Sequence, residues 1–182
     1  ERLLERCRAP IRKFGPLEGV GLAVAGKVNA VRSMLTSAGN LGHWVGEPVT
    51  QMVGDLLGAP VALGNDAEAL ALADAVYGLG QSDEFRGVDS MNMIWGTGIG
   101  GCCVRYYNDQ TITIPAEPGH VCVKANSQNK CGCGQYGCLE AYAGGSGIER
   151  IYSKPPAELS KEEWLDVAGW MAIGLRSILA VQ

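Results

Sequence analysis

Residues 117–140 read EPGHVCVKANSQNKCGCGQYGCLE and carry the strongest signal in the chain. One histidine and three cysteines in this stretch follow the pattern His…Cys-x-Cys-x4-Cys: His120, Cys131, Cys133 and Cys138. One imidazole and three thiolates form a common ligand set of structural, tetrahedral zinc sites. Gly132, Gly134 and Gly137 allow the positive φ angles or close backbone approaches that a chain wrapped around an ion requires. The stretch therefore predicts a zinc loop over residues 120–138.

The three cysteines could also serve in a core, in a disulfide or in an iron–sulfur cluster. Ordinary buried cysteines need no metal, but these three fall within eight residues and are interleaved with glycines. A disulfide would leave one thiol unpaired, and Cys131 and Cys133 are too close in sequence to bridge without strain. An iron–sulfur cluster usually has cysteine at all ligand positions. Zinc is the prediction, and these three roles stay open as alternatives.

The composition limits the class of protein. The chain has 182 residues, of which 47% are hydrophobic and 19% charged, as in an ordinary globular protein. A net charge of −4 without clustered Lys or Arg argues against nucleic-acid binding. No apolar run is long enough to span a membrane, and the first residues do not resemble a signal peptide, so we expect a cytoplasmic protein that does not contact membranes. The odd number of cysteines, seven, also suits a reducing compartment.

Apolar runs alternate with glycine clusters, which predicts an α/β protein with ligand-binding loops at its strand ends. Strands are expected over residues 17–25, 60–63, 90–95, 102–107 and 111–114, and helices over 48–57, 67–77, 139–143 and 161–181. A polar segment at residues 81–87 suggests a seam between two lobes, residues 1–78 and 79–182. We also expect a piece of a longer chain, because the sequence starts without Met and stops inside a predicted helix.

Two further segments could carry chemistry. Asp66 follows a predicted strand and opens a helix, so its carboxylate should project from a strand end, although an N-cap is the ordinary role there. The glycine turn 96–101 offers backbone N–H groups that suit an anion, although such a turn is also an ordinary hairpin connection. Amide, carboxylate and imidazole groups in loops would suit a polyhydroxylated ligand. These groups belong to Asn65, Glu117, His120 and Glu140.

Five motifs in this order and spacing resemble the ROK family of sugar kinases and sugar-responsive repressors. They are GNLGHW (39–44), GNDAEALALA (64–73), GTGIGG (96–101), EPGH (117–120) and CGCGQYGCLEAYA (131–143). The resemblance implies the ribonuclease-H-like, two-lobe fold of actin and hexokinase, here incomplete at its N- and C-termini. It implies ATP-dependent phosphorylation of a hexose or N-acetylhexosamine. The alternatives are the sugar-binding domain of a ROK transcriptional regulator and, third, a zinc module used only for interactions.

The resemblance also implies residue roles. Asp66 matches the catalytic base of the family. The positions that hold sugar hydroxyls match Asn40, Asn65, Glu117, His120 and Glu140. The loop that receives the ATP phosphates, with Mg²⁺, matches Gly96, Thr97, Gly98, Gly100 and Gly101. The zinc ligands match His120, Cys131, Cys133 and Cys138, and the ion would fix the loop that carries Glu117 and Glu140. A homodimer is expected from the resemblance alone.

Overall fold

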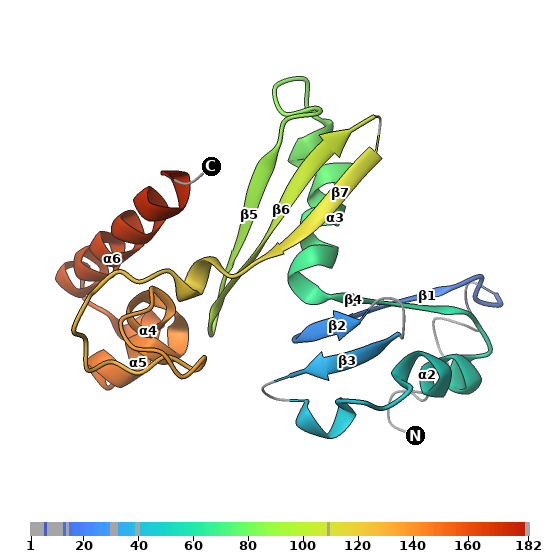
Figure 1. Ribbon diagram of the computed structural model, residues 1–182, viewed down its shortest axis with the longest axis horizontal. Helices are drawn as coiled ribbons and strands as arrows, with labels where there is room; N and C mark the ends of the chain where they lie inside the picture. Colours follow the sequence, from blue (N-terminus) through green and yellow to red (C-terminus); the bar gives the residue numbers. More distant parts are fainter. Residues whose placement is uncertain are drawn as a thin grey trace. The chain divides into compact units, whose positions relative to one another are not determined.

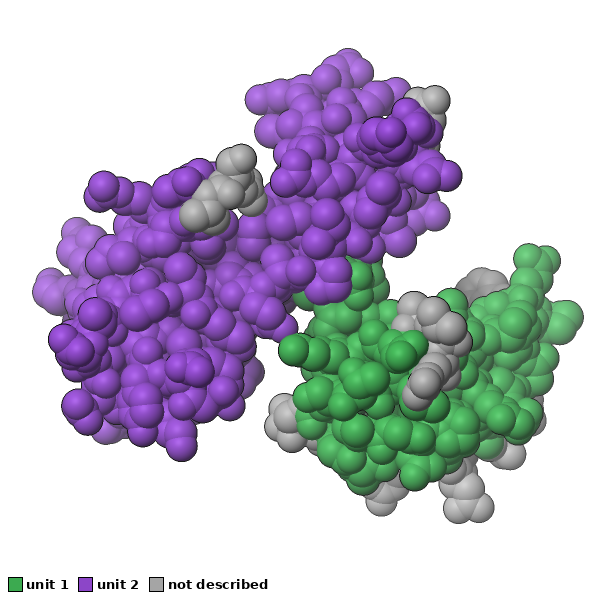
Figure 2. All heavy atoms as spheres, in the orientation of Figure 1, with its two compact units in different colours: residues 1–69 green, residues 70–182 purple. Residues whose placement is uncertain are grey.

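A computed structural model describes residues 6, 13, 15–29, 33–38, 41–108 and 110–180. The chain forms two compact units, residues 1–69 and 70–182, which Figure 2 shows in different colours. Asn40, one of the expected sugar-binding residues, lies outside the described residues. Across the part of the chain that is described, no helix combines the length and the apolarity needed to cross a membrane.

Between residues 15 and 65, the described part of the first unit contains a parallel pair of strands, an antiparallel pair, a 3-10 turn and a helix. These are β1 (Val20–Val24) with β4 (Val61–Asn65), β2 (Lys27–Asn29) with β3 (Met34–Ser37), η1 (Gly42–Trp44) and α2 (Val49–Leu57). The apolar face of α2 buries Val49 and Val53 against Val24 and Leu35. Gly58 ends α2 with a left-handed φ of 69°, and its N–H donates to the carbonyl of Gly54 at 2.7 Å. The helix expected over residues 48–57 is therefore confirmed.

The two parallel strands end at the same edge. Val24, the last residue of β1, lies opposite Asn65, the last residue of β4. Helix α3 (Asp66–Tyr77) begins directly after β4. Because ligands of α/β proteins bind at the carboxyl ends of parallel strands, this junction is where a functional side chain is expected.

The second unit contains an antiparallel sheet followed by helices (Figure 1). Its elements are η2 (Leu79–Gln81), β5 (Ser90–Trp95), β6 (Ile99–Tyr107), β7 (Gln110–Ala116), η3 (Pro118–His120), α4 (Glu140–Ala143), α5 (Gly145–Tyr152), η4 (Pro156–Glu158) and α6 (Lys161–Leu179). Helix α3 packs on one face of this sheet, where Ala71 and Ala75 meet Cys102 and Val104. The small alanine side chains let the helix approach the sheet closely.

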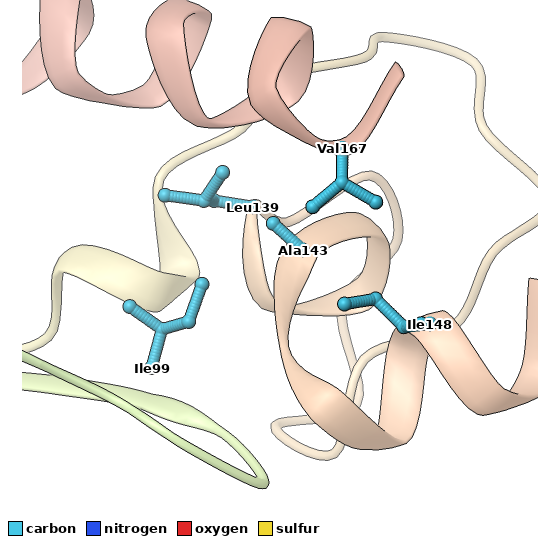
Figure 3. Packing of buried hydrophobic residues seen from close by; sticks show 5 residues of the cluster. All are labelled: Ile99, Leu139, Ala143, Ile148 and Val167. Atoms are coloured by element: carbon cyan, nitrogen blue, oxygen red, sulfur yellow. The ribbon is translucent and has the colours of Figure 1, made fainter. Parts of the chain in front are cut away.

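The main core of the second unit joins the start of β6 to the helices. Its buried residues come from β6, α4 and its preceding residue, α5 and α6, and Figure 3 shows how they pack: Ile99, Leu139, Ala143, Ile148 and Val167. Burying one large aliphatic side chain stabilises a fold by about 1.5–3 kcal/mol. This core therefore fixes Leu139, which follows the last cysteine of the segment, and the partly buried Val121, next to His120, packs against it.

The structure corrects the extent of the glycine turn. Strand β6 begins at Ile99, so Gly100 and Gly101 lie in the sheet opposite Ile94 and Met93, and the turn contains only residues 96–98. The physical reason is close packing, because a Cβ at position 101 would lie 2.7 Å from the carbonyl oxygen of Asn92. Two elements were not predicted from the sequence, the β2–β3 hairpin and α5.

Candidate functional site

Four potential metal ligands meet beside the start of α4. His120 ends η3, and Cys131, Cys133 and Cys138 lie in the loop that leads into α4. The four donor atoms all lie within 4.8 Å of one another. Cys131 and Cys138 are buried and Cys133 is exposed, so solvent reaches the cluster from the side of Cys133. We call these four side chains the Cys/His cluster.

Two of the distances between donor atoms in the Cys/His cluster match those of a tetrahedral zinc site. The sulfurs of Cys133 and Cys138 lie 3.8 Å apart, and the sulfur of Cys131 lies 3.6 Å from Nδ1 of His120. With Zn–S bonds of about 2.3 Å and a Zn–N bond of about 2.05 Å, a regular tetrahedron separates two sulfurs by about 3.8 Å. The same tetrahedron separates sulfur from nitrogen by about 3.6 Å. These two distances therefore fit zinc, and the other donor atoms, all within 4.8 Å of one another, would need only small side-chain shifts to complete the tetrahedron.

Two glycines shape the loop around the cluster, and burial changes the pKa values of its thiols. Gly134 and Gly137 have positive φ angles of 91° and 78°, which confirms the predicted need for glycine at these two positions. Burial raises the pKa of the Cys131 thiol to about 12 and also raises that of Cys138, whereas the backbone N–H of Gln135 lowers the pKa of Cys133. A metal ion binding here must displace protons from the buried thiols, so its affinity should rise with pH.

Polar contacts connect the Cys/His cluster to the start of β6. Oε2 of Glu117 lies 3.8 Å from Nε2 of His120, whose Nδ1 faces Cys131. The Cys131 thiol donates to Oε1 of Glu140 at 3.4 Å, and the N–H of Ile99 donates to Oε2 of the same carboxylate at 2.8 Å. Glu117 and Glu140, which were expected to bind sugar together with His120, thus lie beside the predicted metal ligands, of which His120 is one.

The shortened glycine turn, residues 96–98, is held by α5. The N–H groups of Gly145 and Ser146 donate to the carbonyls of Gly96 and Thr97, each at 2.9 Å. No described residue accepts a hydrogen bond from the N–H of Thr97 or Gly98. Two neighbouring N–H groups without a partner are suited to bind an anion such as phosphate.

A cavity of about 480 Å³ opens beside this turn. The turn and the start of α5 line one part of it, and Trp95, Glu149 and Trp164 line the rest. Its volume lies within the range of about 300–1,000 Å³ that small-molecule sites occupy. The rings of Trp95 and Trp164 meet edge to face with centroids 6.2 Å apart. The cavity therefore has Thr97, one of the two residues with an unpartnered N–H, and two tryptophans in its lining.

At the end of β4, Asn65 caps helix α3, whereas the next residue, Asp66, has an exposed carboxylate. Oδ1 of Asn65 accepts from the N–H groups of Ala67 and Glu68 at 2.9 and 3.2 Å, and its Nδ2 donates to the carbonyl of Gly26 at 2.9 Å. Asn65 is therefore the N-cap of α3. Asp66 is exposed, and the one hydrogen bond that its carboxylate accepts within the described residues comes from the N–H of Ala67 at 3.0 Å. The cap expected at Asp66 is thus made by Asn65, and the Asp66 carboxylate is available to a ligand.

These motifs and this geometry agree with a comparison against known families. The model of the ROK family matches residues 7–171. The chain belongs to the ROK family. An N-acetylgalactosamine kinase, AgaK, from Shewanella sp. (strain ANA-3) is 34% identical over 161 residues, which cover 82% of this ROK chain and 50% of that kinase. A glucokinase from Streptomyces coelicolor is 34% identical over 145 residues, covering 79% of this chain and 44% of the relative.

Solved structures agree with the fold. The ROK hexokinase from Thermus thermophilus superposes with a TM-score of 0.72 at 27% identity, covering 99% of this chain and 64% of the hexokinase. The actin- and hexokinase-type α/β fold expected from the sequence is therefore confirmed. The chain spans about half the length of the curated relatives described above, 50% and 44%.

Sequence reasoning missed two parts of the site. The first is the start of α5, whose Gly145 and Ser146 hold the glycine turn, and the second is Trp164 in the wall of the cavity. The run of glycines around Ser146 was a usable signal, because a second glycine cluster after a helix often marks a close backbone approach. Trp164 had no such signal, since it occupies a regular position in a long helix.

Proposed function

We propose that this ROK chain is part of a kinase that transfers the γ-phosphate of ATP to a hydroxyl of a hexose or N-acetylhexosamine. The observation that carries the proposal is the exposed carboxylate of Asp66, which α3 does not use as its cap because Asn65 makes the cap. The two curated relatives described above are both sugar kinases by name, which supports this class of reaction.

In this proposal Asp66 accepts the proton of the sugar hydroxyl as its oxygen attacks phosphorus. Phosphoryl transfer requires mainly that the nucleophile be positioned and that the charge on the transferred group be offset. The unpartnered N–H groups of Thr97 and Gly98 are placed to bind phosphate oxygens, and Mg²⁺ would accompany the nucleotide. Asn65, Glu117, His120 and Glu140 would hold sugar hydroxyls, as would Asn40, which the structure does not describe.

Zinc would have a structural role here. His120 would bind it through Nδ1, which leaves Nε2 facing Glu117 and free for a hydroxyl group. Cys131, Cys133 and Cys138 would supply the thiolates. Bound zinc would fix the loop that follows His120 and leads into Glu140, so its contribution would be to position these residues. The lobe boundary at residues 78/79, the cytoplasmic location and the homodimer remain predictions.

The test compares two aspartate variants of the full protein, assayed for ADP formation with Mg²⁺-ATP and a panel of hexoses and N-acetylhexosamines. Removing a general base typically lowers the rate by about 10²–10⁴-fold, so Asp66→Asn should lower kcat by that factor. The matched control is Asp55→Asn, which changes an exposed aspartate on α2 and should leave kcat unchanged. Equal turnover by wild type and Asp66→Asn would exclude the proposed role. Sugar binding without ADP formation in wild type would favour the regulator instead.

A further inference from the structure

We propose that Glu140 is a positioning residue that holds the glycine turn, residues 96–98, in place. The resemblance to the family suggested only that Glu140 contacts sugar. The new role concerns the glycine turn, where phosphate would bind, and not the sugar. Only the meaning of the turn as a phosphate site depends on the proposed function; the contacts themselves do not.

The two oxygens of Glu140 serve two different segments. Oε2 accepts from the N–H of Ile99 at 2.8 Å, and Ile99 is the first residue after the turn. Oε1 lies 3.4 Å from the thiol of Cys131, one of the four predicted metal ligands. The carboxylate therefore forms a direct bridge between α4 and the turn, and its contact with Cys131 is a hydrogen bond only while that thiol carries its proton. A hydrogen bond to an ionised acceptor is stronger than one between neutral groups, which makes this bridge a substantial restraint.

The backbone on both sides fits this bridge. Glu140 is the first residue of α4, and the preceding residue, Leu139, is fully buried in the core of Figure 3, so the carboxylate starts from a fixed position. A Cβ at Gly98 would lie 2.5 Å from Oε2 of Glu140. Glycine at position 98 thus leaves the space that the carboxylate occupies.

The turn is restrained from a second direction as well. The first N–H groups of α5 bind the carbonyls of Gly96 and Thr97, whereas Glu140 binds the N–H of Ile99. These contacts leave the N–H groups of Thr97 and Gly98 without a partner among the described residues. Glu140 and α5 together therefore set the orientation of the two amides that would bind phosphate.

Hydrogen exchange of the backbone amides tests the bridge directly and needs no activity. The variants are Glu140→Ala, Glu140→Gln, which keeps an acceptor oxygen, and the control Glu158→Ala, which removes an exposed carboxylate in η4. A hydrogen bond to a charged group corresponds to about a 10- to 100-fold change in a local opening equilibrium. Exchange of the Ile99 amide should therefore accelerate by about that factor in Glu140→Ala. It should change less in Glu140→Gln and stay at the wild-type rate in Glu158→Ala.

The strand β7 is the internal reference, because it should keep its wild-type exchange in all three variants. Two results would overturn the proposal: an unchanged Ile99 amide in folded Glu140→Ala, or a uniform acceleration that includes β7.

Kinetics separate this role from a pure sugar contact. If Glu140 positions the turn, Glu140→Ala raises the KM for ATP about tenfold or more, and Glu140→Gln recovers most of that loss. A rise confined to the KM for sugar would contradict the proposal. If wild type phosphorylates no sugar, the proposed function fails, while the exchange experiment still decides the bridge.

Discussion

Replacing Asn65 is expected to separate the two hydrogen-bonding roles of its amide. Its Oδ1 caps α3 through Ala67 and Glu68, and its Nδ2 ties the start of the helix to the carbonyl of Gly26. Asn65→Ala removes both roles. Asn65→Asp keeps the cap but loses the donor, and it places a carboxylate near the Gly26 carbonyl.

The magnitude follows from these contacts. Loss of an N-cap costs about 1 kcal/mol, and loss of one neutral hydrogen bond costs about 0.5–1.5 kcal/mol. We therefore expect Asn65→Ala to lower the free energy of unfolding by about 2 kcal/mol, and Asn65→Asp by about 1 kcal/mol. The order wild type, Asn65→Asp, Asn65→Ala is the essential point, because it distinguishes a cap with a tether from a residue that only contacts a ligand.

The assay is urea unfolding followed by far-ultraviolet circular dichroism, with hydrogen exchange at the amides of Ala67 and Glu68. Exchange at these amides should accelerate in Asn65→Ala and much less in Asn65→Asp. Gln51→Ala, an exposed change on α2, is the control and should leave stability within about 0.5 kcal/mol of wild type. The reasoning is refuted if Asn65→Ala is as stable as wild type, or if Asn65→Asp is as destabilised as Asn65→Ala.

Three further predictions concern the second unit. Leu139→Ala should lower the free energy of unfolding by about 2–5 kcal/mol, because Leu139 is fully buried in the core, and a loss under about 1 kcal/mol in urea unfolding would contradict this packing. Ser160→Ala should cost about 1 kcal/mol in the same assay, since it removes the capping box in which Ser160 Oγ and Glu163 bind each other's backbone N–H; no measurable loss would count against it. Tyr152 donates to Asp166 at 2.6 Å, and its pKa is raised from 10.0 to about 12, first by burial and then by Asp166. Because the pKa is raised in the folded state, the stabilisation from Tyr152 is complete below pH 10 and is lost as the pH rises through about 12. The difference in free energy of unfolding between wild type and Tyr152→Phe should therefore shrink over that interval. A constant difference across these pH values would disprove the assignment.

Elements with strong periodicity were predictable from the sequence, and elements that depend on distant partners were not. Strand β5 appears with the expected bounds and helix α2 starts one residue later than expected, because apolar spacing and terminal glycines act locally. Helix α5 begins in a glycine-rich segment whose propensity opposes a helix. It forms because its first N–H groups bind the turn carbonyls and because Ile148 is buried. Those partners lie far away in the sequence.

The same distinction applies to the site. The Cys/His cluster was predictable because three of its four ligands lie within eight residues, so spacing alone specifies the geometry. The bond from Ile99 to Glu140 joins residues 41 positions apart, and no local pattern indicates it. Asn65 and Asp66 are adjacent and both are good caps, so only the backbone geometry decides which of them caps α3.

Metal analysis of the purified protein, combined with zinc X-ray absorption, tests the central claim most directly. The claim predicts about one zinc per chain with three sulfurs at about 2.3 Å and one nitrogen at about 2.0–2.1 Å. Cys131→Ser should lose the metal, whereas Cys103→Ser, outside the Cys/His cluster, should retain it. Protein without zinc, or zinc bound by oxygen and nitrogen alone, would contradict the claim.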